Sequence, residues 1–345
     1  MRTITINNRI IGENHLPLVI AEIGINHEGS IETAFSMVDS AIRAGAEFIK
    51  FQTHIIDEEM SPEAKKFIPG NAKESIYEIM KRCVLSQEEE YRLAKYIKSK
   101  NTTFISTPFS KRAVDRLIKI NVPCFKIGSG ECNNLDLISY ISKFKKPIIM
   151  STGMNDLNSI KESVNIIEKR KIPLAILHCT NVYPTPYEII RLNAITELKN
   201  KFKNNIIGYS DHAVGITPCL SAVTLGAKII EKHYTDFKHR PGPDISCSMD
   251  EVELFELKKN IQIIFDTMKG NLNSVKEENI TKKFAFSTAV ATKNLHKGHT
   301  LKKGDIKFQR PQAGDYLTKD LNKILNKKLS TDIKQNEHFK KNHFK

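Results

Sequence analysis

Two histidines, His212 and His233, each follow an apolar run that ends in a cluster of polar residues. The first run reads IIGYSDH from Ile206, and the second reads KIIEKH from Lys228. A buried parallel strand is written as a nearly continuous apolar run, and α/β enzymes place their chemistry at the carboxyl ends of such strands. Because the spacing of the two histidines matches one α–β repeat, we expect both imidazoles to lie at neighbouring strand ends.

This pair of imidazoles could form half of a divalent-metal site. The carboxyl groups of Asp211, Glu231 and Asp244 are near in the sequence, and two nitrogen ligands leave positions open for water and substrate oxygens. Such an open, octahedral site suits Mn²⁺ best, with Mg²⁺ or Co²⁺ as alternatives, and differs from a closed tetrahedral zinc site. The competing interpretation is two structural histidines held by hydrogen bonds. We predict that His212 and His233 bind the metal.

Lys50 and Lys126 lie inside apolar runs that should form buried strands. A lysine in such a run can extend its ammonium group to solvent at a sheet edge. Two desolvated lysines instead need an anionic partner, which a bound phosphate or carboxylate provides. Turns of sequence Gly-Ser-Gly at 128–130 and Ser-Thr-Gly at 151–153 add N–H groups and hydroxyls that can hold phosphate oxygens. The combination predicts a site for an anionic, phosphorylated ligand.

Further polar side chains end the other predicted strands. Because side chains inside a barrel pack as apolar layers, polar residues at the strand ends converge on one mouth. These residues are Glu22, Gln52, Thr107, Ser129, Glu131, Ser151, Asn181, Tyr183 and Ser210. Glu22, Glu131 and Asp244 are our candidate acid–base groups, and the competing role for each carboxylate is an ion pair with Lys50 or Lys126.

Apolar runs alternate with segments of helical spacing along most of the chain. The runs are 18–25, 47–53, 103–107, 124–128, 147–152, 174–180, 206–210 and 228–233. Eight βα units in about 250 residues predict a (β/α)8 TIM barrel, preceded by a short hairpin over residues 2–12. An open doubly wound sheet is the competing fold, but EIGINHEG after the first run lacks the G-x-G-x-x-G dinucleotide pattern. The long connection at 54–85 should lie over the active face.

A polar stretch without apolar periodicity, GNLNSVKEENITKK, predicts a domain boundary. We therefore divide the chain into a catalytic barrel with its hairpin at 1–270, a linker at 271–283 and a small domain at 284–345. The small domain reads as short strands and turns. Arg310, in its FQRPQAGD segment, is either solvated or presented rigidly. A domain of this size is marginal alone, so we expect it to dock on another surface.

Composition favours an ordinary globular protein of the cytoplasm. The chain has 345 residues, 40% hydrophobic and 27% charged, with no apolar stretch of membrane-spanning length. Its six cysteines include no C-x-x-C pair, which suits reduced thiols. Most of the net charge of +14 lies in residues 281–345, where no nucleic-acid-binding motif occurs. We therefore expect neither nucleic acid nor membrane as a partner, and interpret the basic tail as a solvated face or an attraction for an anionic substrate.

These motifs together resemble the bacterial sialic acid synthases, the N-acetylneuraminate synthase family. The resemblance rests on EIGINHEGS, STPFS, FKIGSGECNN, STGMN, HCTNVYPTPYE, GYSDH and RPGPDISCSM, and spans residues 17 to about 315. The segment FAFSTAVATKNLHKGHTLKKGDIKFQRP is similar to the antifreeze-like (SAF) domain of those enzymes. The resemblance implies a TIM barrel whose SAF domain is swapped onto the partner of a homodimer.

The family's reaction, as the resemblance implies it, joins phosphoenolpyruvate, N-acetylmannosamine and water into N-acetylneuraminate and phosphate. Carried over to matching positions, the residues around phosphoenolpyruvate would be Lys50, Gln52, Thr107, Lys126, Ser129, Ser151, Asn181 and Ser210. Mn²⁺ would be bound by His212 and His233 and would polarise the sugar aldehyde. The sugar would contact Tyr183, Glu131 and Asp244, with Arg310 reaching its N-acetyl group across the dimer. Glu22 would direct the water or stabilise the cation at C2.

Three alternatives remain open at this stage. Within the family, the acceptor could be the di-acetamido precursor of a legionaminic- or pseudaminic-type acid, and two departures from the family pattern, Phe51 and 213–217, bear on that choice. A non-catalytic sugar- or phosphate-binding protein should lack one of the paired lysines or histidines. An aldolase-type lyase would need a Schiff-base lysine or a metal acting on pyruvate, and no phosphate site.

Overall fold

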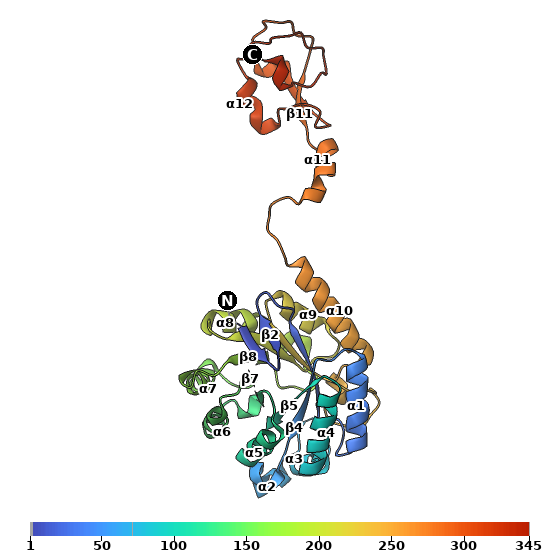
Figure 1. The fold of residues 1–345 in the computed structure, drawn as a ribbon, viewed down its shortest axis with the longest axis vertical. Coiled ribbons are helices and arrows are strands. Elements are labelled where there is room, and N and C mark those ends of the chain that lie inside the picture. Colours follow the sequence, from blue (N-terminus) through green and yellow to red (C-terminus); the bar gives the residue numbers. More distant parts are fainter. Residues whose placement is uncertain (1–2, 71, 345) are drawn as a thin grey trace. The chain divides into compact units, whose positions relative to one another are not determined.

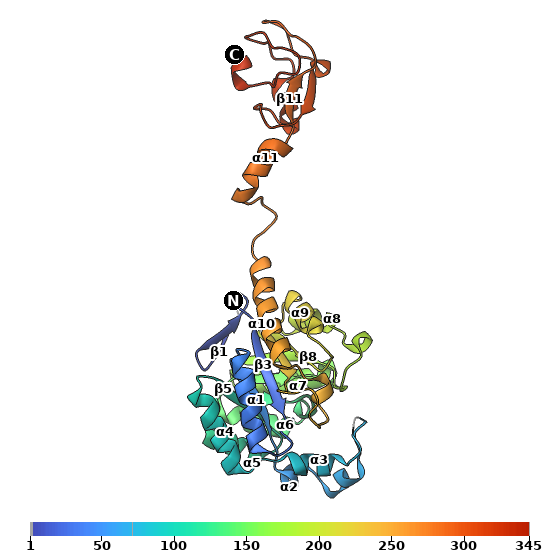
Figure 2. The same cartoon turned by 90° about the vertical axis from the view of Figure 1, so that its right-hand side faces the viewer.

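The computed structural model describes residues 3–70 and 72–344. The chain divides into two compact units, Met1–Lys269 and Gly270–Lys345, each with its own hydrophobic core. Figures 1 and 2 show the first unit as a barrel surrounded by helices and the second as a small β-containing domain.

The chain begins with the predicted hairpin. Strands β1 (Thr3–Ile6) and β2 (Arg9–Gly12) pair antiparallel. Asn7 and Asn8 form the turn with φ of 48° and 68°, the left-handed values that a two-residue type I′ turn requires. The inward-facing side chains Ile4, Ile6 and Ile11 join the residues at the floor of the barrel in one buried cluster. The hairpin therefore closes the end of the barrel opposite its mouth.

Eight parallel strands form the barrel, in the hydrogen-bonded order β5-β4-β3-β10-β9-β8-β7-β6. Their bounds are β3 (Leu18–Gly24), β4 (Phe48–Thr53), β5 (Thr103–Pro108), β6 (Phe125–Ile127), β7 (Ile148–Ser151), β8 (Leu174–Cys179), β9 (Ile206–Asp211) and β10 (Ile229–His233). Strand β10 lies between β9 and β3, so the last strand returns beside the first. The predicted fold class is confirmed.

Helices surround these strands. Their bounds are α1 (Ile31–Arg43), α2 (Ile56–Glu59), α3 (Ile76–Cys83), α4 (Gln87–Ser99), α5 (Lys111–Ile120), α6 (Leu135–Ile141), α7 (Leu157–Lys169), α8 (Asn193–Lys201), α9 (Thr217–Thr224) and α10 (Glu251–Thr267). Several begin at a residue whose side chain accepts a hydrogen bond from a free backbone N–H group of the first turn. At Ser86 and Asp250, a glutamate three residues later also accepts a hydrogen bond from the backbone N–H of the capping residue. The sequence thus marks where many barrel helices start.

Side chains alternate along each strand between the inside of the barrel and the helix layer. On β4, Phe48 belongs to the interior cluster, while Ile49 and Phe51 pack in the outer core. The ring of Phe51 lies 5.9 Å from that of Phe104 and 5.9 Å from that of His27. This departure from the family pattern therefore lies in the outer core, on the face of β4 opposite Lys50.

The connection between β4 and α4 is the long one that the sequence indicated. It contains α2, a 3-10 turn at Pro62–Lys66 and α3. Ile79 and Cys83 of α3 pack against Ile25 at the end of β3. The Arg82 guanidinium also forms an ion pair with the Glu28 carboxylate. These contacts hold the connection beside the mouth of the barrel.

The second unit has a core of its own. Strands β11 (Thr288–Ala291) and β12 (Ile306–Gln309) pair antiparallel, and α12 (Leu321–Ile324) follows them. Its buried apolar residues are Ala289, Ala291, Leu295, Leu301, Ile324, Leu329, Ile333 and Phe339. The stretch predicted as a linker holds a 3-10 turn at Lys276–Glu278 and the start of α11 (Asn279–Ala285). Across the described ranges, no helix has the length and apolar character needed to cross a membrane.

Candidate active site

A cavity of about 820 Å³ opens at the carboxyl ends of the barrel strands. The predicted site residues that line it are Glu22, Lys50, Gln52, Thr107, Lys126, Ser129, Glu131, Ser151, Asn181, Tyr183, Ser210, His212, His233 and Asp244. Arg310 is exposed in the C-terminal unit and lies outside this lining. The long connection contributes Met60, Ile76, Ile79 and Met80 to the wall. Residues from all eight strand ends therefore meet in one space.

The inner wall carries a layer of four buried charges. Lys50 Nζ lies 2.7 Å from Glu22 Oε1 and 3.8 Å from Glu231 Oε1. Lys126 Nζ lies 3.6 Å from the same Glu231 oxygen. The four side chains are between 2% and 7% exposed, so each charge depends on the others for compensation. Two ammonium groups and two carboxylates make the layer neutral when all four are ionised.

Glu231 was named from the sequence as a carboxyl group near the two histidines but was given no role in the site. It is the middle residue of β10, and it points inward because it alternates with Ile230 and Lys232, which face the helix layer. Its position two residues before His233 could have revealed it, since residues two apart on a strand share a face.

Hydroxyl groups complete the surroundings of the two lysines. Lys126 Nζ donates to Ser151 Oγ at 2.7 Å, and Lys50 Nζ lies 3.2 Å from Thr107 Oγ1. The Gly153 N–H donates to Ser129 Oγ at 3.0 Å. Ammonium, hydroxyl and backbone N–H groups in one wall can donate several charge-assisted hydrogen bonds to a phosphate and a carboxylate.

Burial changes the proton affinity of these groups. Desolvation raises the pKa of Glu22 to about 7, although Lys50 opposes the change. Desolvation likewise lowers the pKa of Lys126, with Glu231 opposing it. The pKa of Asp244 rises to about 6 because the carboxyl is buried, despite the attraction of His212. Carboxyl groups with pKa values near neutrality can exchange protons during a reaction.

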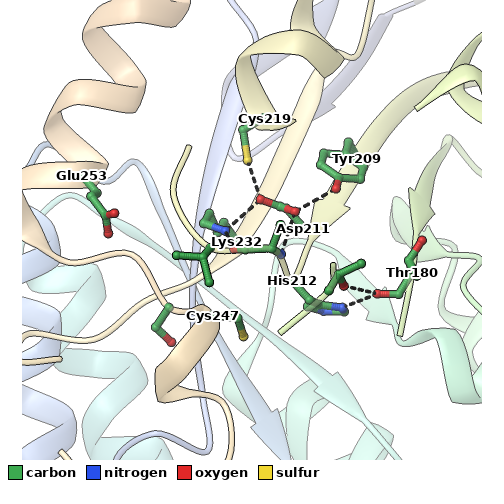
Figure 3. Close-up of polar contacts among 12 residues, drawn as sticks. Thr180, Tyr209, Asp211, His212, Cys219, Lys232, Cys247 and Glu253 are labelled. Atoms are coloured by element: carbon green, nitrogen blue, oxygen red, sulfur yellow. Dashed lines mark hydrogen bonds and ion pairs between the residues drawn. The ribbon is translucent and has the colours of Figure 1, made fainter. Parts of the chain in front are cut away.

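The two predicted metal ligands lie side by side. The ring centroids of His212 and His233 are 5.3 Å apart, and the Tyr183 ring stacks on His212 at 4.0 Å. His212 Nδ1 lies 2.8 Å from the Thr180 carbonyl oxygen (Figure 3). Because a carbonyl can only accept, Nδ1 carries the proton and Nε2 keeps its lone pair for a ligand. The hydrogen bond therefore selects the tautomer that a metal site needs.

The residues fit a divalent cation with an open coordination sphere. His233 Nδ1 is buried, has no hydrogen-bond partner within the described part of the chain and lies 3.8 Å from Asp244 Oδ2. A bound cation nearby would offset the cost of such buried polar groups. Over residues 3–70 and 72–344, no three His, Cys, Asp or Glu side chains are grouped to hold a metal. Substrate and water oxygens would therefore fill most of the coordination positions.

A chain of hydrogen bonds connects the rim to the charged layer. Glu59 Oε1 lies 2.8 Å from His54 Nδ1, and His54 Nε2 lies 3.0 Å from Gln52 Oε1. Gln52 Nε2 then donates to Glu22 Oε1 at 3.0 Å. The sequence analysis did not single out Glu59, because it belongs to the long connection and its pairing with His54 depends on how that segment folds back. This chain connects the long connection, through His54 and Gln52, to the candidate acid–base group Glu22.

Comparison with known families matches residues 37–273 to the NeuB family and residues 287–345 to the SAF domain. Among similar proteins, an uncharacterized protein of Methanocaldococcus jannaschii is 38% identical over 341 residues, covering 98% of this chain and 97% of its own. The N,N′-diacetyllegionaminic acid synthase of Campylobacter jejuni is 37% identical over 310 residues, covering 86% and 91%. The crystal structure of N-acetylneuraminic acid synthetase from Leptospira borgpetersenii matches with a TM-score of 0.75 and 32% identity, covering 81% of this chain and 95% of that chain.

The position of Gly153 gives a test of the anion site. A Cβ there would collide with Asn181 Oδ1 and lie 2.9 Å from Ser129 Oγ, whereas a Cβ at Gly304 would meet nothing within 4 Å. We predict that Gly153→Ala displaces both side chains and weakens phosphoenolpyruvate binding by about 10- to 100-fold, the loss of one charge-assisted contact. Isothermal titration calorimetry measures the affinity. Gly304→Ala is the matched control, and equal affinities in the two variants would contradict the assignment.

The raised pKa of Glu22 predicts a pH dependence of stability. The pKa of this carboxyl is about 7 in the folded protein against an ordinary value of 4.5. Between those values the folded state holds more protons than the unfolded state, so stability falls as pH rises through this window. Glu22→Gln removes the titration, and the wild type should therefore lose about 3 kcal/mol more than the variant between pH 4.5 and 7. Urea unfolding without ligands measures both curves, and parallel curves would refute the prediction.

Proposed function

The chain belongs to the NeuB family of phosphoenolpyruvate-dependent nonulosonic acid synthases, and from that premise we propose that it joins phosphoenolpyruvate to N-acetylmannosamine, giving N-acetylneuraminate and phosphate. The proposal rests on one observation: the buried lysines Lys50 and Lys126 line the same cavity as the imidazoles of His212 and His233. A non-catalytic anion-binding protein has no need of the two histidines. An aldolase-type lyase has no need of the phosphate site.

The lysines bind and orient the first substrate in this proposal. Phosphoenolpyruvate carries a phosphate and a carboxylate, and the two ammonium groups offset those charges inside the barrel. Ser151 Oγ and Thr107 Oγ1, already within hydrogen-bond distance of the ammonium groups, add donors on either side. The enol carbon C3 is thereby held facing the cavity. Orientation of this kind supplies a large part of the rate enhancement in a bimolecular reaction.

The imidazole pair binds the metal, for which we propose Mn²⁺. When bound, a divalent cation supplies Lewis-acid polarisation of the acceptor's aldehyde oxygen. The Thr180 carbonyl holds the His212 ring in the binding tautomer. The Tyr183 ring, stacked on His212, restricts rotation of that imidazole and shields it from bulk water. Asp244 and Glu131 line the same cavity, and in this proposal they contact the sugar hydroxyls.

In this proposal, Glu22 accepts the proton of the attacking water. After C3 bonds to the aldehyde carbon, C2 is electron-deficient, and water must add there before phosphate leaves by C–O cleavage. A carboxyl with a pKa of about 7 is partly deprotonated near neutral pH and can accept the water proton. Gln52 fixes one Glu22 oxygen through its amide N–H. Lys126 then stabilises the charge on the departing phosphate.

A di-acetamido sugar, giving a legionaminic- or pseudaminic-type acid, is the second candidate acceptor. A similar protein from Campylobacter jejuni is named N,N′-diacetyllegionaminic acid synthase, at 37% identity. Ile76, Ile79 and Met80 give the cavity an apolar wall that could receive the methyl group of a second acetamido substituent. Both acceptors share the same carbonyl chemistry, so the choice between them concerns this wall rather than the mechanism.

The reaction is tested by phosphate release from phosphoenolpyruvate labelled with ¹⁸O in the oxygen between C2 and phosphorus. We expect release with N-acetylmannosamine and Mn²⁺, inhibition by EDTA, and the label in phosphate because the C–O bond breaks. Label retained in the sugar acid would contradict the mechanism, as would full activity in His212→Ala or His233→Ala. Mass spectrometry identifies the product with each acceptor. A strong preference for the di-acetamido sugar would replace the acceptor and keep the mechanism.

We further propose a domain-swapped homodimer in which Arg310 contacts the sugar in the partner's cavity. The described lining of the cavity contains lysines and histidines but no arginine, and Arg310 is exposed within its own unit. Ile280 and Phe284 on α11 are 75% and 61% exposed, as expected of a segment that another surface covers.

Complementation between two defective chains tests this arrangement, assayed at a sugar concentration far below the KM of the Arg310→Ala variant. Arg310→Ala should raise KM for the sugar much more than KM for phosphoenolpyruvate. When Arg310→Ala is co-expressed with Lys126→Ala, each mixed dimer gains one cavity with an intact lysine and the partner's intact arginine. Activity should then recover to about a quarter of wild type, since about half of the dimers are mixed and each has one complete site. If the arginine acts within its own chain, no recovery will occur.

A further inference from the structure

A buried ion pair lies on the outer face of the barrel, directly behind the two imidazoles. Lys232 Nζ and Asp211 Oδ2 are 2.8 Å apart, and both side chains are 0% exposed. Lys232 and Asp211 are opposed residues in the ladder between β10 and β9. Each immediately precedes a predicted metal ligand, His233 and His212 respectively. Figure 3 shows the ion pair beside His212.

The pair also holds the backbone on the far side of His212. Lys232 Nζ donates to the Ala213 carbonyl oxygen at 2.5 Å, and the Ala213 N–H donates to Asp211 Oδ1 at 3.0 Å. Tyr209 OH donates to the same carboxylate oxygen at 2.7 Å, and the Cys219 thiol to the other at 3.3 Å. The residues before and after His212 are thus fixed by one carboxylate and one ammonium group.

Two further contacts fix His212 from the other side. The Thr185 N–H donates to the His212 carbonyl at 2.9 Å, and His212 Nδ1 donates to the Thr180 carbonyl. Both partners come from the segment that follows β8. The position of His212 is therefore determined by its neighbours in sequence, by β10 and by the β8 segment together.

Stability alone does not account for a fully buried ion pair. Replacing such a pair by apolar residues of similar volume is often neutral or stabilising, because desolvating two charges costs more than their attraction returns. The preceding pair of this ladder, Ile230 and Tyr209, belongs to the outer apolar core. An apolar pair at positions 211 and 232 would therefore have apolar neighbours, and the ionic pair needs a geometric explanation.

We propose that Asp211 and Lys232 are positioning residues whose ion pair fixes the separation and orientation of the two imidazoles, and thereby sets the affinity of the site for its divalent metal. The proposal rests on the assignment of His212 and His233 as metal ligands in the proposed function. A one-residue shift of either strand would turn that strand's imidazole to the other face, away from its partner. Opposite charges at the last paired position oppose such a shift and smaller displacements of the strand ends.

The test measures Mn²⁺ affinity directly, by electron paramagnetic resonance of free Mn²⁺ during titration. One variant, Asp211→Asn with Lys232→Met, removes the ionic contact and keeps an acceptor for the Ala213 N–H. A second, Asp211→Leu with Lys232→Met, replaces the pair by apolar side chains. We expect both to bind Mn²⁺ about 10- to 100-fold more weakly than wild type, the usual cost of removing a group that orients a ligand. Phosphoenolpyruvate affinity without metal should change less than about 2-fold, because the lysine layer remains intact.

Thermal unfolding separates positioning from general destabilisation. The pair between Arg116 and Glu90 is also largely buried, with side chains 14% and 5% exposed, and lies away from the imidazoles. Arg116→Met with Glu90→Gln is therefore the matched control, expected to lower the melting temperature and leave Mn²⁺ affinity unchanged. Wild-type Mn²⁺ affinity in either Asp211–Lys232 variant would overturn the proposal, as would equal weakening in the control. If the wild type does not bind Mn²⁺, both this proposal and the assignment of the metal ligands are wrong. The proposed reaction is tested separately, by phosphate release in the activity assay.

Discussion

The structure depends on keeping two ammonium groups, those of Lys50 and Lys126, buried in the inner wall of the barrel. Each would be unstable there alone, and Glu22 and Glu231 compensate them from β3 and β10. The apolar layer beneath, closed by the hairpin, prevents water from entering through the floor. Because the compensating carboxylates sit in the same wall, an incoming anion meets ammonium groups that are already oriented, and the reorganisation cost is small.

The raised pKa of Glu22 follows from the same constraint. Burial of this carboxyl raises its pKa to about 7, because desolvation outweighs the attraction of Lys50 and the neighbouring Glu231 adds repulsion. A second anion, such as a bound phosphate, would favour that protonated form further. Anion binding and acid–base chemistry are therefore coupled through this layer. The hydrogen bonds from Glu22 through Gln52 and His54 to Glu59 extend the coupling to the connection at the rim.

Sequence reasoning predicted the barrel and most of the cavity lining because both follow from local patterns. Apolar runs mark parallel strands, and polar residues at their ends must meet at one mouth. It gave no role to Glu231, which the sequence shows only as one member of the polar cluster that ends its run, and it missed Glu59, whose partner His54 is found only once the connection folds back. It also treated Phe51 as relevant to the sugar, although alternation along β4 directs this ring to the helix layer. Contacts across strands require the register, which no local pattern encodes.

Alternation along β10 directs three consecutive side chains to two different faces of the barrel wall. Glu231 and His233 line the cavity, where Glu231 contacts the two lysines and His233 is a proposed metal ligand, while Lys232 between them faces the helix layer and pairs with Asp211. Strand β9 and the residue after it repeat the arrangement, with Ser210 and His212 lining the cavity and Asp211 outside. Since side chains on opposite faces of one strand move together, rigidity on the outer face limits motion on the inner one. Substitutions of cavity-facing residues should thus remove groups that bind the ligand. Substitutions of residues that face the helix layer should leave those groups in place and change their separation and orientation.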